Sequence, residues 1–244
     1  TIHQIPEPTV PEPPVLQTQS VTTQRPTNLP TGMFLEILQP NIIHNAPRTG
    51  GLNYFIPKWM LLTQDPWVLQ TIQGHHVEFM NPPVQHSFPG MPSLSPSQEK
   101  ILDQEMKELL SKEAIHQVQA QTSSNEGFIS SIFIVPKKDG GNRPVINLKP
   151  LNQFLVYEHF KMEGIHMLRD LFKQDDYLVK IDLKDAYLTV PIWKDHQKYL
   201  QFLWKGALDE FACLPFGLAT APRAFTKLMT PVVAALRQQG IRLI

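Results

Sequence analysis

Asp182 is the first candidate for chemistry in this sequence. It ends an apolar run that begins at Tyr177, and a second acid, Asp185, and an aromatic residue, Tyr187, follow within one short turn. A carboxylate at the end of an apolar strand is costly to bury unless something binds it. The arrangement is suited to holding a divalent metal ion and a phosphorylated ligand. The alternative is that Asp182 only starts a turn, as aspartate often does after a strand.

A second candidate site is a basic cluster around a glycine-rich turn. Lys137, Lys138, Arg143 and Lys149 flank this turn, which has the sequence Asp-Gly-Gly-Asn. Because neighbouring residues on a strand face opposite sides, only one of Lys137 and Lys138 is expected to point inward, and both remain candidates. The alternative is that the cluster is the solvated tip of a hairpin, which is common.

Overall composition excludes some classes of protein but does not identify this one. The chain has 244 residues and a formal net charge of +0, whereas a free-standing nucleic-acid binder is usually basic. The single cysteine, Cys213, excludes an internal disulfide framework and a multi-cysteine zinc site, and it is predicted to lie in the core. His75 and His76 lack further ligands at metal-binding spacing and are predicted to form a surface pair.

The sequence shows no sign of a membrane or secreted protein. No apolar run approaches the ~20 residues needed to span a bilayer. The first residues, from Thr1, have neither the basic nor the apolar region of a signal peptide. We therefore expect an intracellular protein, in the cytoplasm or nucleus. The absence of an initiator methionine at Thr1 suggests a piece of a longer polyprotein.

Composition divides the chain into three parts. Residues 1–50 are rich in proline, glutamine and threonine, which predicts an extended, largely disordered linker. Residues 51–94 contain most of the aromatic residues before the main domain and are expected to dock against it. Residues 95–244 have the pattern of a globular domain that is long enough to bury a core.

The expected elements of the third part mix helices and strands. Helices are expected from Ser95, with Leu102, Met106, Leu109 and Leu110 on the buried face, over residues 165–172, and from Thr220 to Gly240. Strands are expected over residues 128–135, 143–148, 177–182, 200–204 and 210–214. Because these elements do not alternate regularly as βαβ units, the predicted fold class is α+β.

Three segments in order resemble the fingers and palm of a retroelement reverse transcriptase. They span residues 134–152, 177–187 and 214–225, and the resemblance extends from about Ser95 to the C-terminus. Lys-Ile-Asp-Leu-Lys-Asp-Ala-Tyr and Leu-Pro-Phe-Gly-Leu are most similar to the motifs of DIRS-like elements, which are retrotransposons that carry a tyrosine recombinase. The aromatic stretch over residues 54–79 is similar to what precedes the polymerase in those elements.

The resemblance implies a two-metal polymerase of the right-hand type. Asp182 matches the first catalytic aspartate, and it would bind Mg²⁺ or Mn²⁺ together with the backbone carbonyl of Leu183; the full-length enzyme uses two such ions. Lys137 or Lys138, with Arg143, would clamp the triphosphate from the fingers hairpin.

The remaining matches imply a nucleotide pocket. The backbone of Asp185 and Ala186 would meet triphosphate oxygens, and Asp185 is not expected to be a metal ligand. Tyr187 would lie under the sugar and exclude a 2′-hydroxyl, although an ordinary packing aromatic is the alternative. Phe216 and Gly217 would sit beside the incoming base and the primer terminus.

The resemblance also implies partners and a missing part. The partners are an RNA or DNA template with its primer, deoxynucleoside triphosphates, and the rest of the polyprotein: a thumb, a ribonuclease H segment and, in DIRS-like elements, a recombinase. Relatives carry further catalytic carboxylates in a Tyr-x-Asp-Asp hairpin beyond the helix that ends at Gly240, whereas this sequence stops at Ile244.

One carboxylate cannot build a two-metal centre, so the chain as written is expected not to extend a primer. An in-frame Tyr-x-Asp-Asp after Ile244 would support an enzyme fragment. A stop codon there would support the alternative, a non-catalytic remnant that at most binds nucleic acid or a protein.

Overall fold

The computed structural model describes residues 49–90, 92–118, 127–136, 142–164 and 166–244. The described residues all belong to one compact unit. Most of the expected linker, residues 1–50, lies outside them, as do Lys137 and Lys138.

A five-stranded sheet is the frame of the described residues. Its strands are β1 (Ile115–Gln117), β2 (Ile129–Pro136), β3 (Asn142–Asn147), β4 (Gln201–Trp204) and β5 (Ala207–Phe211), in the spatial order β1-β5-β4-β2-β3. β2 and β4 are parallel, and the other neighbours are antiparallel. The sheet thus combines antiparallel hairpins with one parallel pair, without regular βαβ repeats. This confirms the predicted α+β class.

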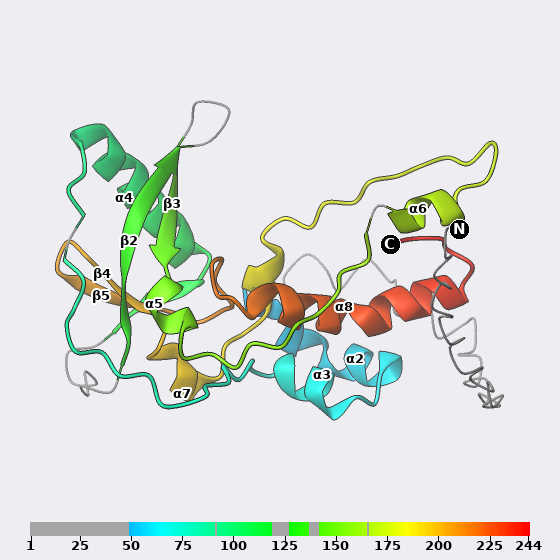
Figure 1. Cartoon of the computed structure of the whole chain (residues 1–244), viewed down its shortest axis with the longest axis horizontal. Helices are drawn as coiled ribbons and strands as arrows, with labels where there is room; N and C mark the ends of the chain where they lie inside the picture. Colours follow the sequence, from blue (N-terminus) through cyan, green and yellow to red (C-terminus); the bar gives the residue numbers. More distant parts are fainter. Residues whose placement is uncertain (1–48, 91, 119–126, 137–141, 165) are drawn as a thin grey trace, which may run out of the picture. The chain divides into compact units, whose positions relative to one another are not determined.

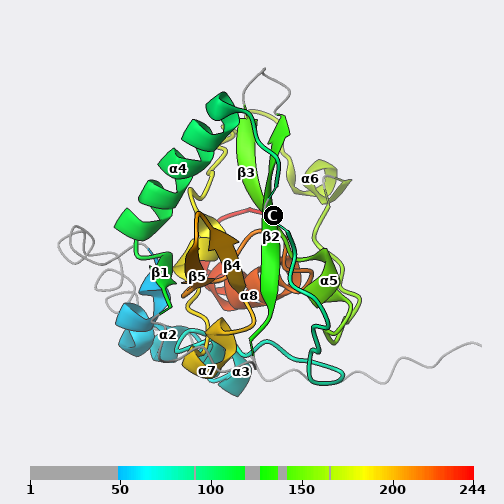
Figure 2. The same cartoon turned by 90° about the vertical axis from the view of Figure 1, so that its left-hand side faces the viewer.

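Helices and short 3₁₀ turns surround the sheet. They are η2 (Gly51–Phe55), α2 (Ile56–Leu62), α3 (Pro66–Thr71), α4 (Pro96–Ser111), α5 (Lys149–Asn152), α6 (His166–Leu171), η3 (Ala186–Thr189), α7 (Lys194–Gln197) and α8 (Ala221–Gln238). α4 packs along β3, as Figure 2 shows. The expected helix over residues 165–172 is confirmed as α6.

The start of α4 follows directly from its sequence. The Ser95 hydroxyl accepts a hydrogen bond from the Gln98 N–H, and the Gln98 side chain accepts one from the Ser95 N–H, which completes the predicted capping box. Leu102, Met106 and Leu109 are buried as expected. The prediction that Leu110 is buried is wrong, because it is rotated about 100° from Leu109 and lies on the exposed side.

The two ends of α8 also match the sequence. Thr220 precedes its first residue, and Pro231 lies inside it. Gly240 adopts the left-handed conformation, with φ 83°. The Gly240 N–H donates to the Arg237 carbonyl and the Ile241 N–H donates to the Leu236 carbonyl, which is the Schellman pattern of helix termination.

Residues 51–94 contribute to the same buried cluster as the sheet. Trp59, Val68, Ile72 and Val77 are buried in that cluster. α2 and α3 contact α8, and Figure 1 shows them beneath it. The Lys227 ammonium lies 4.2 Å from the centre of the Trp67 ring, which adds a cation–π contact between α8 and α3.

The prediction of a surface pair at His75 and His76 is wrong for His75. A parallel bridge joins His75 to Ile192, and the His75 N–H donates to the Pro191 carbonyl over 2.7 Å. The Trp67 ring of α3 lies edge-on to the His75 ring, 6.4 Å away between centroids, and only 6% of His75 is exposed.

The prediction of a strand over residues 177–182 is also wrong. Tyr177 is 100% exposed, Val179 85% and Ile181 80%, and the segment has no strand assignment. A strand is stable only when a neighbour pairs with its backbone, and within the described ranges no other segment does so. Figure 1 shows this stretch as an extended trace between α6 and η3.

The last expected strand is shifted toward the N-terminus. Lys205 and Gly206 both have positive φ, 46° and 81°, so a two-residue hairpin turn leads straight into β5 at Ala207. The strand ends at Phe211, after which Cys213 is buried and bridges to Pro191. Among the described helices, none has the length and apolar character needed to cross a membrane.

Candidate functional site

A cavity of about 540 Å³ lies between α4, the β2–β3 hairpin and the turn before η3. Its lining is mostly apolar, with Met106, Leu109, Ile132, Ile146, Leu188 and Phe211 among the residues that face it. Its charged lining residues are Glu105, Lys112 and Asp185. Phe216 and Gly217 also line it, so the structure brings together three of the residues predicted for a nucleotide pocket.

Asp185 forms the turn that leads into η3. Its backbone is left-handed, with φ 55° and ψ 33°, a conformation that aspartate tolerates better than most residues. Its carboxylate oxygen Oδ2 accepts a hydrogen bond from Lys112 Nζ over 3.1 Å. Lys112 was not predicted as a site residue: it follows the end of α4, 73 positions before Asp185, and no local pattern links the two.

Tyr187, in the second motif (residues 177–187), packs against two aromatic residues of the third motif (residues 214–225). Its half-buried ring lies 5.1 Å from the ring of Phe216 and 5.5 Å from the ring of Phe225, measured between centroids. The turn that carries it is closed by two further hydrogen bonds: Thr189 Oγ1 donates to the Ala186 carbonyl, and the Val190 N–H donates to the Tyr187 carbonyl.

The loop that carries Phe216 and Gly217 is held by Asn152, at the end of α5. The Asn152 amide group donates to the Gly217 carbonyl, and its side-chain oxygen accepts from the Ala219 N–H, each over 2.9 Å. Gly217 has φ 97°, a backbone conformation that is strained for any residue with a side chain. Phe216 is 56% exposed at the mouth of the cavity. Asn152 belongs to the first motif, but no sequence pattern predicts its hydrogen bonds to the third motif.

The predicted triphosphate clamp is only partly within the described residues. Lys137 and Lys138 lie outside them. The backbone of Arg143 is paired with Val135 in the β2–β3 hairpin, and the next residue, Pro144, lines the cavity. Arg143 therefore lies in the strand that borders the pocket.

The predicted metal ligands lie apart from this cavity. Asp182 and Leu183 are exposed on the extended segment before the Asp185 turn. In the part of the chain that the structure describes, no group of three or more histidine, cysteine or acidic side chains is placed to hold a metal ion. The carboxylate of Asp185 is engaged by Lys112. These residues alone do not fit a complete two-ion centre.

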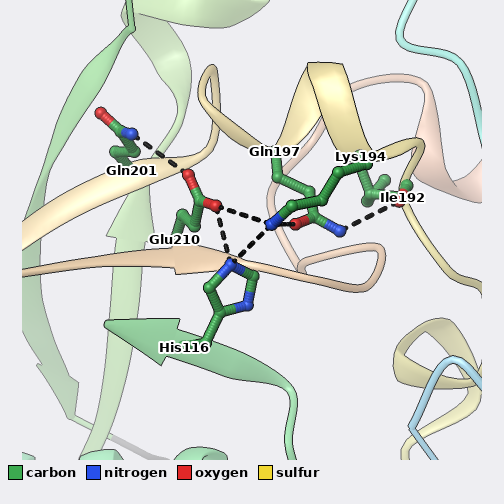
Figure 3. Close-up of polar contacts among 6 residues, drawn as sticks. All are labelled: His116, Ile192, Lys194, Gln197, Gln201 and Glu210. Carbon is green, nitrogen blue, oxygen red and sulfur yellow. Dashed lines mark hydrogen bonds and ion pairs between the residues drawn. The ribbon is translucent and has the colours of Figure 1, made fainter. Parts of the chain in front are cut away.

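A polar network supports the sheet on the face opposite the cavity. Glu210 precedes Phe211, which lines the cavity, and successive side chains on a strand face opposite sides. As Figure 3 shows, the Glu210 carboxylate is contacted by His116 Nε2 at 2.7 Å, Gln201 Nε2 at 3.1 Å and Lys194 Nζ at 3.4 Å. Burial raises the pKa of Glu210, but these hydrogen bonds and charges outweigh burial and lower it. The network ties β1, β4 and β5 to α7.

Comparisons with known proteins agree with this geometry. Residues 135–244 match the family described as reverse transcriptase (RNA-dependent DNA polymerase). The Tf2-3 and Tf2-7 transposon polyproteins of Schizosaccharomyces pombe are each 26% identical over 110 residues, which is 45% of this chain and 8% of the relative. The chain thus spans less than a tenth of the curated relatives it matches.

A solved structure shares the fold. The protease–reverse transcriptase of prototype foamy virus superposes with a TM-score of 0.53 at 17% sequence identity, covering 68% of this chain and 21% of that one. The segment that the family model matches contains Asp182, the Asp185 turn and Phe216. Residues 135–244 therefore match the reverse transcriptase family, and a 110-residue stretch of the chain is similar to part of retrotransposon polyproteins.

Proposed function

We propose that this chain supplies the fingers and part of the palm of an RNA-directed DNA polymerase within a longer, DIRS-like retrotransposon polyprotein. The observation that supports this most directly is the cavity lined by Asp185, Phe216 and Gly217, with Tyr187 packed against Phe216. These residues come from two separate motifs of the matched segment and meet at one site.

The pocket's chemistry is that of a nucleotide site. The left-handed turn at Asp185 presents consecutive backbone N–H groups, from Asp185 and Ala186, that can donate to triphosphate oxygens. Tyr187 would lie under the sugar, where its ring leaves no room for a 2′-hydroxyl. Phe216 and Gly217 would flank the incoming base, with the exposed Phe216 ring available for stacking.

The fingers hairpin would complete the pocket with positive charge. Arg143 and one of Lys137 and Lys138 are its proposed triphosphate clamp. Fixed cations beside the transferring phosphoryl group stabilise the negative charge that develops there in the transition state. The backbone of Arg143 lies on β3, whose residues Pro144, Val145 and Ile146 line the cavity, and the nearness of this hairpin to the cavity supports the assignment.

The metal site is proposed as shared with other parts of the longer protein. Asp182 and the carbonyl of Leu183 are this chain's contribution to binding Mg²⁺ or Mn²⁺, which prefer oxygen ligands. Further carboxylates are required, and the described residues do not provide them at this place. The proposed partners are a primed RNA or DNA template, deoxynucleoside triphosphates, and the thumb, ribonuclease H and recombinase parts of an intracellular polyprotein.

The test is primer extension by a protein continued beyond Ile244 along its own reading frame. Purified protein is incubated with an oligo-dT-primed RNA template, deoxynucleotides and Mg²⁺ or Mn²⁺. We expect template-dependent synthesis. Template binding without synthesis in either metal would contradict the proposal and support a binding module that has lost catalysis.

A further inference from the structure

We propose that Lys112 is a positioning residue of the nucleotide pocket, which fixes the turn carrying Asp185, Ala186 and Tyr187 through its ion pair with Asp185. This inference rests on the proposed function, because the turn matters for catalysis only if the pocket binds a nucleotide. Lys112 itself is not proposed to touch the substrate.

The contact joins two elements that are far apart in the chain. Lys112 caps the C-terminal end of α4, where its N–H donates to the Glu108 carbonyl. Its ammonium lies 3.1 Å from Asp185 Oδ2 and 3.9 Å from Glu108 Oε2. The nearer partner is therefore Asp185, and both side chains are partly shielded from water, with 32% and 26% exposed.

The turn at Asp185 needs an external support. A left-handed backbone costs some free energy even at aspartate, so contacts around Asp185 help to maintain it. An aspartate before a helix commonly accepts a hydrogen bond from that helix's own N–H groups, but Asp185 makes no such bond to η3. Its carboxylate is directed to Lys112 instead.

The far end of the turn is held separately. Thr189 Oγ1 and the Val190 N–H donate to the Ala186 and Tyr187 carbonyls, and Leu188 is buried beneath them. Lys112 thus holds the start of a short element whose end is fixed by its own bonds. Loss of Lys112 would free the backbone of Asp185 and Ala186 and the ring of Tyr187 to shift together.

The expected effect is on the site rather than on the fold. Partly exposed ion pairs contribute little to global stability. A small displacement of groups that bind a substrate can nevertheless lower kcat/KM for that substrate by a large factor. We expect the nucleotide KM to rise, the deoxy-to-ribo preference to fall, and the folded state to remain.

The first test uses the extended polymerase with Lys112→Met, Lys112→Arg and, as a control on the same helix, Lys100→Met. Lys100 is exposed and does not line the cavity. We expect Lys112→Met to raise the KM for deoxynucleotide about tenfold, equivalent to about 1.4 kcal/mol, with a smaller change in kcat. Lys112→Arg keeps the positive charge and should have a KM close to that of wild type. Lys100→Met should have the same KM as wild type.

A double-mutant cycle tests whether Lys112 acts through Asp185. Adding Lys112→Met to Asp185→Asn should change the KM by less than twofold, because the ion pair is already lost. Equal effects of Lys112→Met in both backgrounds would overturn the role through Asp185. A KM for Lys112→Met equal to that of Lys100→Met would overturn it as well.

The second test does not need polymerase activity. Hydrogen exchange of the amides in residues 185–190 is measured in the 244-residue chain, where Lys112→Met should exchange faster than wild type and Lys100→Met should not. Unchanged exchange would overturn the positioning role even if the extended wild-type protein is active. Faster exchange together with an inactive extended wild type would instead refute the polymerase assignment and leave Lys112 as the support of the turn.

Discussion

The ring of Tyr187 lies 5.1 Å from the ring of Phe216, tilted by 40°, and Phe216 lines the cavity between α4 and the β2–β3 hairpin. Tyr187 also meets Phe225 of α8 edge to face, with the rings 5.5 Å apart. The ring of Tyr187 thus packs against the third motif and α8, while its backbone belongs to the turn at Asp185. This packing fixes the ring that is proposed to exclude a 2′-hydroxyl.

The first prediction concerns sugar choice in the extended polymerase. Tyr187→Ala should lower the ratio of kcat/KM for dGTP to that for GTP by at least about tenfold, because the space of the ring becomes open to a 2′-hydroxyl. Tyr187→Phe keeps the ring and should retain the preference. Single-nucleotide incorporation on one template measures both, and a ratio for Tyr187→Ala within about twofold of wild type would mean that Tyr187 only packs.

The second prediction concerns the triphosphate clamp. Arg143→Ala should lower kcat/KM for deoxynucleotide by about ten- to a hundredfold, since a charge-assisted contact contributes roughly 1.5–3 kcal/mol. The change should be mainly in KM, with a fall in kcat if the contact strengthens in the transition state. Steady-state kinetics decide this, and an unchanged kcat/KM would place Arg143 outside the pocket.

Local signals in the sequence were sufficient for much of the fold. The capping box at Ser95, the glycine turns at Gly206 and Gly240, and the apolar spacing of α4 each depend on residues close together in the chain. The prediction of a strand over residues 177–182 was wrong because a short apolar run does not reveal whether another strand is available to pair with it.

Long-range contacts were the part that the sequence did not reveal. The motifs suggested that Asp185, Tyr187 and Phe216 share a site, but the ion pair of Lys112 with Asp185 joins residues that no spacing rule connects. The burial of His75 likewise depends on its bridge to Ile192, which lies on a distant segment.

The third prediction concerns the packing of residues 51–94 on the main domain. Ile72 is completely buried in the same cluster as the sheet residues. Ile72→Ala should therefore lower the free energy of unfolding by about 2–5 kcal/mol in a single transition. Leu61→Ala, at a 40% exposed position of α2, should have a much smaller effect. A separate early transition in chemical denaturation would show that these residues unfold independently.

The fourth prediction concerns stability at acidic pH. Burial, and then the positive charges of His76, His196 and Arg223, lower the pKa of His75 from 6.5 to about 4. As pH falls below 6.5 the unfolded chain takes up a proton at His75 before the folded chain does. The stabilisation present above pH 6.5 is therefore lost toward pH 4, by roughly 3 kcal/mol.

Chemical denaturation between pH 7 and pH 4 measures this dependence. His75→Gln should flatten the loss of stability over that interval, whatever its effect at pH 7. His86→Gln, at an exposed histidine, should leave the slope unchanged. Equal slopes for wild type and His75→Gln would show that His75 does not titrate with a lowered pKa.

The fifth prediction concerns Asp182, which carries the central claim that this chain provides part of a polymerase active site. In the extended protein, Asp182→Asn should abolish primer extension because a neutral amide cannot replace a carboxylate that binds a divalent cation. Template binding should remain nearly intact. Asp170→Asn, which neutralises another exposed acid, should extend primers as wild type does.

The most direct measurement is therefore primer extension by Asp182→Asn, together with its template affinity. The account predicts no detectable synthesis and a template affinity within about twofold of wild type, because the metal ligand acts in the chemical step rather than in template binding. Normal synthesis per bound complex with weakened template binding would contradict it.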